Sequence, residues 1–247
     1  MSRCVVVAID GPAGAGKSTI ARAIARRLGY IYIDTGAMYR AVAVWALRNG
    51  IAPEDSHKLD ELARHARIEF TAGATTVLLN GEDVSEAIRE PAISDAASKV
   101  SALPGVRRAM EEAQRDMAAG SSVVMEGRDI GTVVFPDARV KVFLDADPSV
   151  RARRRVEELR RKGVPVDESA AAREMAERDQ RDSTRADAPL MQAPDAAYVD
   201  TTGLSIDEVV EEVLKITRTR TTNGKQHRND HEAAQSGRHR RTTKDRG

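Results

Sequence analysis

VVVAIDGPAGAGKSTI, residues 5–20, is the stretch that decides the fold. Its apolar, β-branched first half predicts a buried strand, and Ile20, Ile24 and Leu28, spaced four apart, predict that a helix follows. Between the two, Gly11 to Ser18 match the pattern G-x-x-x-x-G-K-[S/T]. Glycines permit positive φ angles and bring backbone N–H groups close to phosphate oxygens, and the start of the next helix favours an anion. The stretch therefore predicts a strand, loop and helix that bind the phosphates of a nucleotide.

The residues of this loop have expected roles in that binding. Backbone N–H groups would surround the phosphates, Lys17 would reach the β- and γ-phosphates, and Ser18 would offer a hydroxyl ligand to Mg²⁺. We therefore expect ATP and Mg²⁺ as cofactors. The expected nucleotide-binding residues are Gly11, Pro12, Ala13, Gly14, Ala15, Gly16, Lys17, Ser18 and Thr19.

The rest of the chain repeats the alternation of strand and helix. Four further short apolar runs, at residues 31–34, 122–126, 140–145 and 198–200, are separated by helical patterns. Strands that alternate with amphipathic helices indicate an α/β fold with a parallel sheet covered on both faces. Residues 67–84 interrupt this order, because an Asn-Gly pair between two extended runs predicts a small antiparallel hairpin.

Composition limits the class of protein. The chain has 247 residues, enough for one domain with a substantial core, and its single cysteine, Cys4, excludes an internal disulfide. We expect Cys4 to be buried in the first strand. The start of the chain lacks the pattern of a signal peptide and no apolar run reaches the length of a membrane span, so we expect a cytoplasmic protein without a membrane segment.

The last 30 residues differ from the body in charge. They contain nine Lys or Arg against three Asp or Glu, a net of +6, while the whole chain has a net charge of +1. Ala233 and Ala234 are their only apolar residues. Such a segment cannot bury enough surface to offset the entropy of ordering, so residues 218–247 are predicted to form a disordered basic tail.

The phosphate loop alone does not separate kinases from GTPases, motors or helicases. The N-K-x-D segment that reads guanine is absent from the sequence. Three other charged motifs are present: DTGAMYR at 34–40, EGRD at 126–129, and Arg178, Asp182 and Arg185, spaced along one helix face. The last set has two interpretations, a solvated ladder of i,i+4 ion pairs or a group that closes over phosphates from a lid.

These motifs together resemble those of bacterial cytidylate kinases. The matching segments are IDGPAGAGKS at 9–18, DTGAMYR at 34–40, EGRDIGTVVFPD at 126–137 and ERDQRDSTR at 177–185, and the resemblance extends from Val5 to Thr217. It implies the nucleoside monophosphate kinase fold, with five parallel strands, a monophosphate-binding insert at about 60–104 and a lid at about 151–167. One kinase domain would then occupy residues 1–217, followed by the basic tail.

The resemblance also implies the substrates and the residues that bind them. ATP would phosphorylate CMP and dCMP. Ser98, Arg107 and Asp129 would read the cytosine edge, and Thr35 and Asp182 would hold the ribose hydroxyls. Arg40, Arg128, Arg178 and Arg185 would grip the phosphates, and the catalytic set would be Lys17, Arg128, Arg178 and Arg185. The chain departs from the family at Thr35, where Ser is frequent, and in the Lys-Ser end of its loop, where some members have Lys-Gly.

Two other functions stay open at this point. One is a small P-loop kinase with a different acceptor, and the other is a nucleotide-gated protein whose basic tail binds RNA. Only the tail is expected to contact nucleic acid, and the protein is expected to be a monomer. The relative use of CMP, dCMP and UMP does not follow from the sequence.

Overall fold

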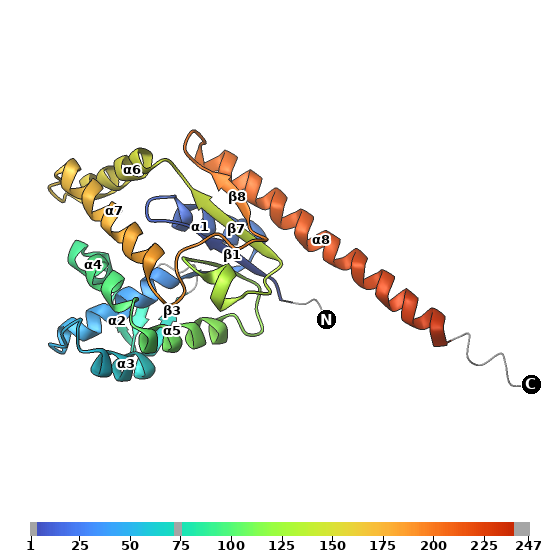
Figure 1. The fold of residues 1–247 in the computed structure, drawn as a ribbon, viewed down its shortest axis with the longest axis horizontal. Helices are drawn as coiled ribbons and strands as arrows, with labels where there is room; N and C mark the ends of the chain where they lie inside the picture. Colours follow the sequence, from blue (N-terminus) through green and yellow to red (C-terminus); the bar gives the residue numbers. More distant parts are fainter. Residues whose placement is uncertain (1–3, 72–75, 240–247) are drawn as a thin grey trace, which may run out of the picture.

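The computed structural model describes residues 4–71 and 76–239, with side chains up to Thr222. At its centre lies a five-stranded parallel sheet in the order β2-β6-β1-β7-β8 (Figure 1). The strands are β1 (Val6–Asp10), β2 (Ile31–Asp34), β6 (Val123–Gly127), β7 (Val140–Asp145) and β8 (Ala197–Asp200). All four pairings are parallel, and the central strands are buried. The predicted α/β sheet is confirmed.

Helices cover both faces of the sheet, and side chains of one strand alternate between the two cores. In β1, Val7 and Ile9 pack in the core under α1 (Lys17–Leu28) and α8 (Ile206–His239), whereas Ala8 joins the core on the opposite face. That second core is built with α2 (Thr35–Arg48), α3 (Ser56–His65), α4 (Pro91–Val100) and α5 (Pro104–Met117). Coverage of both faces explains why these strands are apolar almost throughout.

The predicted hairpin is present as a separate three-stranded antiparallel sheet. It consists of β3 (Ile68–Phe70), β4 (Val77–Leu79) and β5 (Glu82–Asp83), and a short turn of helix, η1 (Ala87–Arg89), leads from it to α4. Asn80 and Gly81 join β4 to β5 with φ angles of 53° and 85°. Two consecutive positive φ angles match the tight turn that Asn-Gly favours.

Two helices form an arm beside the phosphate loop. They are α6 (Pro148–Arg161) and α7 (Glu168–Thr184), and the chain turns between them at Gly163, whose φ is 72°. The residues predicted to form a lid, about 151–167, make up most of α6 and the turn before α7. After β6 the chain makes a short π-helical turn, η2 (Ile130–Val134), which the sequence does not reveal.

Two expectations are corrected. Cys4 is exposed, because β1 begins only at Val6. Residues 218–239 are helical and not disordered, since α8 continues to His239 and projects away from the body (Figure 1). A helix already nucleated on the body adds one hydrogen bond for each further residue, so the extension does not bear the cost of nucleation. Residues 240–247 of the predicted tail lie outside the described residues. No helix in the described part of the chain is long and apolar enough to cross a membrane.

Candidate active site

The phosphate loop connects β1 to α1 and is built by close backbone contacts. Gly11 has a φ of 148°, and a Cβ placed on it would lie 1.9 Å from the carbonyl oxygen of Leu144 in β7. Gly16, with a φ of 91°, precedes α1 without any side-chain cap, so the first N–H groups of α1 stay available to a ligand. A helix start of this kind binds anions.

Lys17 folds over this loop, its Nζ donating to the carbonyl oxygen of Pro12 at 2.7 Å. Burial lowers the pKa of Lys17 to about 7, and the positive charges of Arg128 and Arg178 add to the effect. Glu126 acts in the opposite direction. Lys17, Arg128 and Arg178 thus bring positive charges together around a buried ammonium group, and the negative charge of a phosphate would stabilise them.

Glu126 stands at the end of β6 and connects several of these groups. Its carboxylate accepts a hydrogen bond from the Tyr32 hydroxyl at 2.7 Å and also contacts the side chain of Ser18. Its carbonyl oxygen accepts from Thr35 Oγ1 at 2.7 Å. Burial, followed by the negative charge of Asp34, raises the pKa of Glu126. The sequence marks Glu126 only as part of a motif, and Tyr32 carries no signal at all.

Asp182 on the charged face of α7 is buried, which argues against the interpretation of this face as a solvated ladder. Asp182 has only 4% of its surface exposed and accepts from Arg128 Nε at 2.9 Å. Arg178 Nε lies 3.9 Å from the same carboxylate oxygen, and this buried atom has no hydrogen-bond partner within the described part of the chain. Burial and the neighbouring Arg128 lower the pKa of Arg178 to about 10. A guanidinium whose buried N–H lacks a partner indicates a site for an anion.

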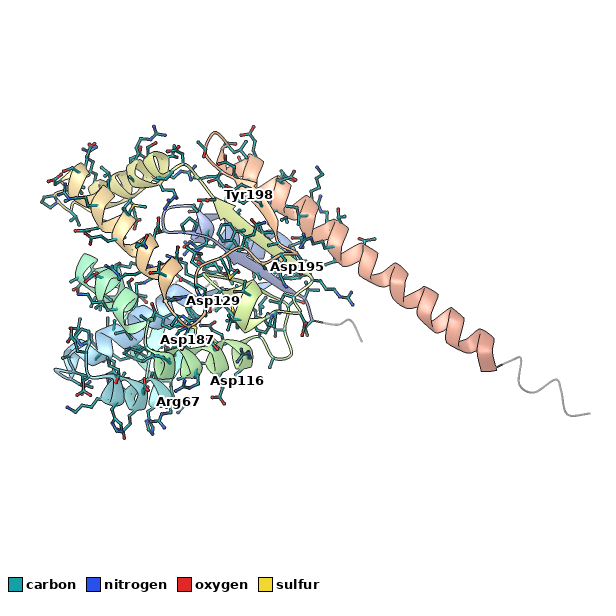
Figure 2. All side chains as sticks on the ribbon, viewed as in Figure 1. Arg67, Asp116, Asp129, Asp187, Asp195 and Tyr198 are labelled. Carbon is teal, nitrogen blue, oxygen red and sulfur yellow. The ribbon has the colours of Figure 1, made fainter. Side chains whose placement is uncertain are left out.

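A second buried cluster surrounds Asp129, which Figure 2 shows between the sheet and the end of α7. Its carboxylate forms ion pairs with Arg107 of α5 and with Arg185, the latter at 3.6 Å. Burial raises the pKa of Asp129, although both arginines oppose the shift. The Arg107 guanidinium also lies 5.8 Å from the ring centre of Tyr39, whose buried hydroxyl has no hydrogen-bond partner in the part of the chain that the structure describes. This cluster presents both donors and an acceptor.

The other predicted site residues lie around these clusters. Arg40 Nη2 donates to Asp34 at 2.9 Å. The described residues show no hydrogen bond from Ser98 of α4 to Asp129 or Arg107. Ser101 connects Ser98 to Arg107 instead. Its hydroxyl donates to the Ser98 carbonyl at 2.9 Å, and Arg107 donates to the Ser101 carbonyl at 3.3 Å.

Two further carboxylates hold the loop and the motifs in place, and neither was singled out from the sequence. Asp10 accepts from the N–H groups of Ile130 and Gly131 at 2.8 and 2.7 Å, and burial raises its pKa to about 7. Asp179 of α7 accepts from the Ala13 N–H at 3.4 Å and pairs with Arg151, which donates to the Ala13 carbonyl at 3.1 Å. The only indication of their role in the sequence is their position, because Asp10 directly precedes the loop and Asp179 directly follows Arg178.

Comparison with known proteins shows to which family the chain belongs. The family model described as cytidylate kinase matches residues 7–219. A cytidylate kinase of Solibacter usitatus (strain Ellin6076) is 63% identical over 223 residues, covering 90% of this chain and 95% of the relative. One of Geobacter sulfurreducens is 53% identical over 222 residues, with 88% and 94% covered, and one of Pelotomaculum thermopropionicum is 51% identical over 211 residues, with 84% and 93% covered. With its phosphate loop, its buried arginines and this match along most of its length, the chain belongs to the cytidylate kinase family.

Proposed function

We propose that the protein transfers the γ-phosphoryl group of ATP to CMP and dCMP, which yields ADP with CDP or dCDP. The observation that carries this proposal is a pair of arginine nitrogens between the phosphate loop and Asp129. Arg178 Nε and Arg185 Nη2 are buried atoms without a hydrogen-bond partner among the described residues, and each has only a longer ion-pair contact, at 3.9 Å to Asp182 and 3.6 Å to Asp129. Cations in such a place are stabilised when they meet the phosphate groups of a substrate, and membership of the cytidylate kinase family names that substrate.

The donor nucleotide would bind at the loop. The N–H groups at the start of α1 and the Lys17 ammonium would hold the β- and γ-phosphates. The donor set fits Mg²⁺, since the Ser18 hydroxyl lies beside the Glu126 carboxylate. No group of three or more His, Cys, Asp or Glu able to hold a metal occurs in the described residues, so the ion would rest mainly on the nucleotide. When bound, it supplies charge neutralisation between the phosphates.

The acceptor would occupy the space next to Asp129. Cytosine carries an amino group beside acceptor atoms, and the Asp129 carboxylate with the Arg107 guanidinium offers the complementary acceptor and donors. Ser98 would complete the reading of the base. Thr35 and Asp182 would hold the ribose hydroxyls.

The phosphates of both substrates would meet arginines from three elements. The set comprises Arg40 of α2, Arg128 after β6, and Arg178 and Arg185 at the end of α7. The acceptor phosphate is already anionic, so the reaction needs alignment and charge neutralisation more than a general base. Because α7 belongs to the arm formed with α6, movement of that arm would bring two of the arginines onto the phosphates and exclude water.

A coupled assay of ADP release across nucleoside monophosphates tests the proposal. CMP and dCMP should give the highest kcat/KM, with UMP lower and AMP and GMP near background. A Lys17→Met variant serves as the control for the donor site and should lose turnover without losing its fold. If another monophosphate or a small alcohol proves the best acceptor, the roles of Asp129 and Arg107 are wrong.

A further inference from the structure

Arg181 lies on α7 but points away from the phosphate-facing arginines, toward α4. Its Nε donates to Ser98 Oγ at 3.3 Å and its Nη2 pairs with Asp95 Oδ1 at 3.0 Å. Both partners belong to α4, which lies beside α7 in Figure 1. The site described above leaves this residue without a role.

We infer that Arg181 is a positioning residue that fixes the direction of the Ser98 hydroxyl and thereby strengthens discrimination of cytosine from uracil. The inference rests on the proposed function, because it takes Ser98 as a reader of the base. It adds a residue that need not touch the nucleotide.

The chemistry of the two side chains supports this role. A hydroxyl has one hydrogen to donate and two lone pairs, whereas a guanidinium N–H can only donate. The contact therefore consumes one lone pair of Ser98 Oγ and prevents its hydrogen from pointing at Arg181. Ser98 is 4% exposed, and no acceptor for its hydroxyl hydrogen occurs among the hydrogen bonds of the described residues. Its remaining hydrogen and lone pair stay available in a restricted orientation.

A hydroxyl of fixed orientation can distinguish the two pyrimidines. At ring position 3 cytosine has an acceptor and uracil a donor, and at position 4 cytosine has a donor and uracil an acceptor. A freely rotating hydroxyl can satisfy either base by turning its hydrogen toward or away from the ring. With one lone pair taken by Arg181, the Ser98 hydroxyl must either donate its hydrogen to the base or leave that hydrogen buried with no acceptor among the described hydrogen bonds. It therefore matches a ring acceptor and opposes a ring donor at the position that it faces, and an opposed pair is costly in a buried site.

The Asp95 contact gives a matched control. Asp95 is half exposed and also pairs with Lys99 at 2.9 Å, so its ion pair with Arg181 is solvated and contributes little. Removing Asp95 loosens the contact between α7 and α4 but leaves the Arg181 Nε–H on Ser98. A role through Ser98 and a role as a general brace between helices therefore predict different results.

The test compares kcat/KM for CMP and UMP in the variants Arg181→Met and Arg181→Ala, which both lack the N–H donor. The Arg181 side chain is more than one third exposed, so both variants should fold. The ratio of CMP to UMP should fall about tenfold, the size expected from one hydrogen bond at a buried site. Most of the loss should come from a higher KM for CMP, with KM for ATP unchanged. Asp95→Asn should keep the ratio within about twofold.

A double-mutant cycle with Ser98→Ala completes the test. In the Ser98→Ala background the Arg181 substitutions should not change the CMP to UMP ratio any further, because there is no hydroxyl left to orient. An equal loss for both nucleotides, or an effect that persists without Ser98, would overturn the inference and make Arg181 a brace only. Failure of the proposed function itself would look different, since the unmutated protein would then show no preference for CMP.

Discussion

Replacing Gly11 with alanine should push β7 away from the phosphate loop, because there is no room for a methyl group between them. The added Cβ would lie 1.9 Å from the Leu144 carbonyl oxygen. Carbon and oxygen atoms in close contact are normally at least about 3.3 Å apart, so the carbonyl would have to retreat by roughly 1.4 Å. β1 and β7 are paired neighbours at the centre of the sheet, and neither has a free side to move into.

The expected cost has two parts. The φ of 148° at Gly11 is strained for any other residue, at about 1–3 kcal/mol. Overpacking of a well-packed contact adds typically about 1–3 kcal/mol. The free energy of unfolding should therefore fall by about 2–6 kcal/mol, and for a chain of this size each kcal/mol lowers Tm by roughly 2–4 °C.

Gly120→Ala provides the matched control. Gly120 also has a positive φ, 79°, but a Cβ placed there meets no heavy atom within 4 Å. Only the backbone strain of about 1–2 kcal/mol remains. Because Gly120 lies between α5 and β6, away from the loop, its variant should keep its activity.

Thermal unfolding and ADP release would be measured on both variants. At a temperature where both are folded, Gly11→Ala should lose about 100-fold in kcat, since a shift of about 1 Å in a positioning element has this effect. If Gly11→Ala loses no more Tm than Gly120→Ala and retains its kcat, the tight contact with Leu144 is not what shapes the loop.

Three other predictions concern the arginines, the lysine and the long helix. Arg178→Ala and Arg185→Ala should each lower kcat by at least about 100-fold while KM for ATP changes only a few-fold; a kcat near that of the unmutated protein would contradict their role. Because the pKa of Lys17 is lowered to about 7 and a bound phosphate favours its charged form, ATP binding should weaken by up to about tenfold per pH unit above that value. Calorimetry in buffers of different ionisation enthalpy should then detect proton uptake, and its absence would contradict the assignment. A chain ending at Thr222 should keep its Tm within about 2 °C and its kcat, since the buried face of α8 ends near Thr217, and a clear fall in either would show that the extension supports the body.

Local patterns in the sequence were sufficient for much of the fold. The phosphate loop is specified by residues that are adjacent in the chain, and the Asn80-Gly81 turn by a backbone conformation that those two residues favour. Such features depend on short-range sterics, so they can be predicted without knowledge of the tertiary structure.

The candidate site was harder to predict where burial decides the role of a charge. Glu174 and Asp182 both belong to the i,i+4 pattern of α7, yet Glu174 is exposed and Asp182 is buried against Arg128. Spacing alone cannot tell the two faces apart, because that depends on what the helix packs against. The same holds for Asp10 and Asp179, because Asp10 accepts from the N–H of Ile130 and Asp179 from the N–H of Ala13, both more than 100 residues away in sequence. The helical extension after Arg218 differs from the prediction because continuation of α8, and not burial, is the source of its order.

The carboxylates beside the arginines have a consequence for turnover. Arg40 pairs with Asp34, and Arg128 pairs with Asp182. A phosphate that arrives must therefore compete with an internal anion, and one that leaves is replaced by it. Binding is then an exchange of partners with a modest net gain, which favours release of the diphosphate product after each cycle.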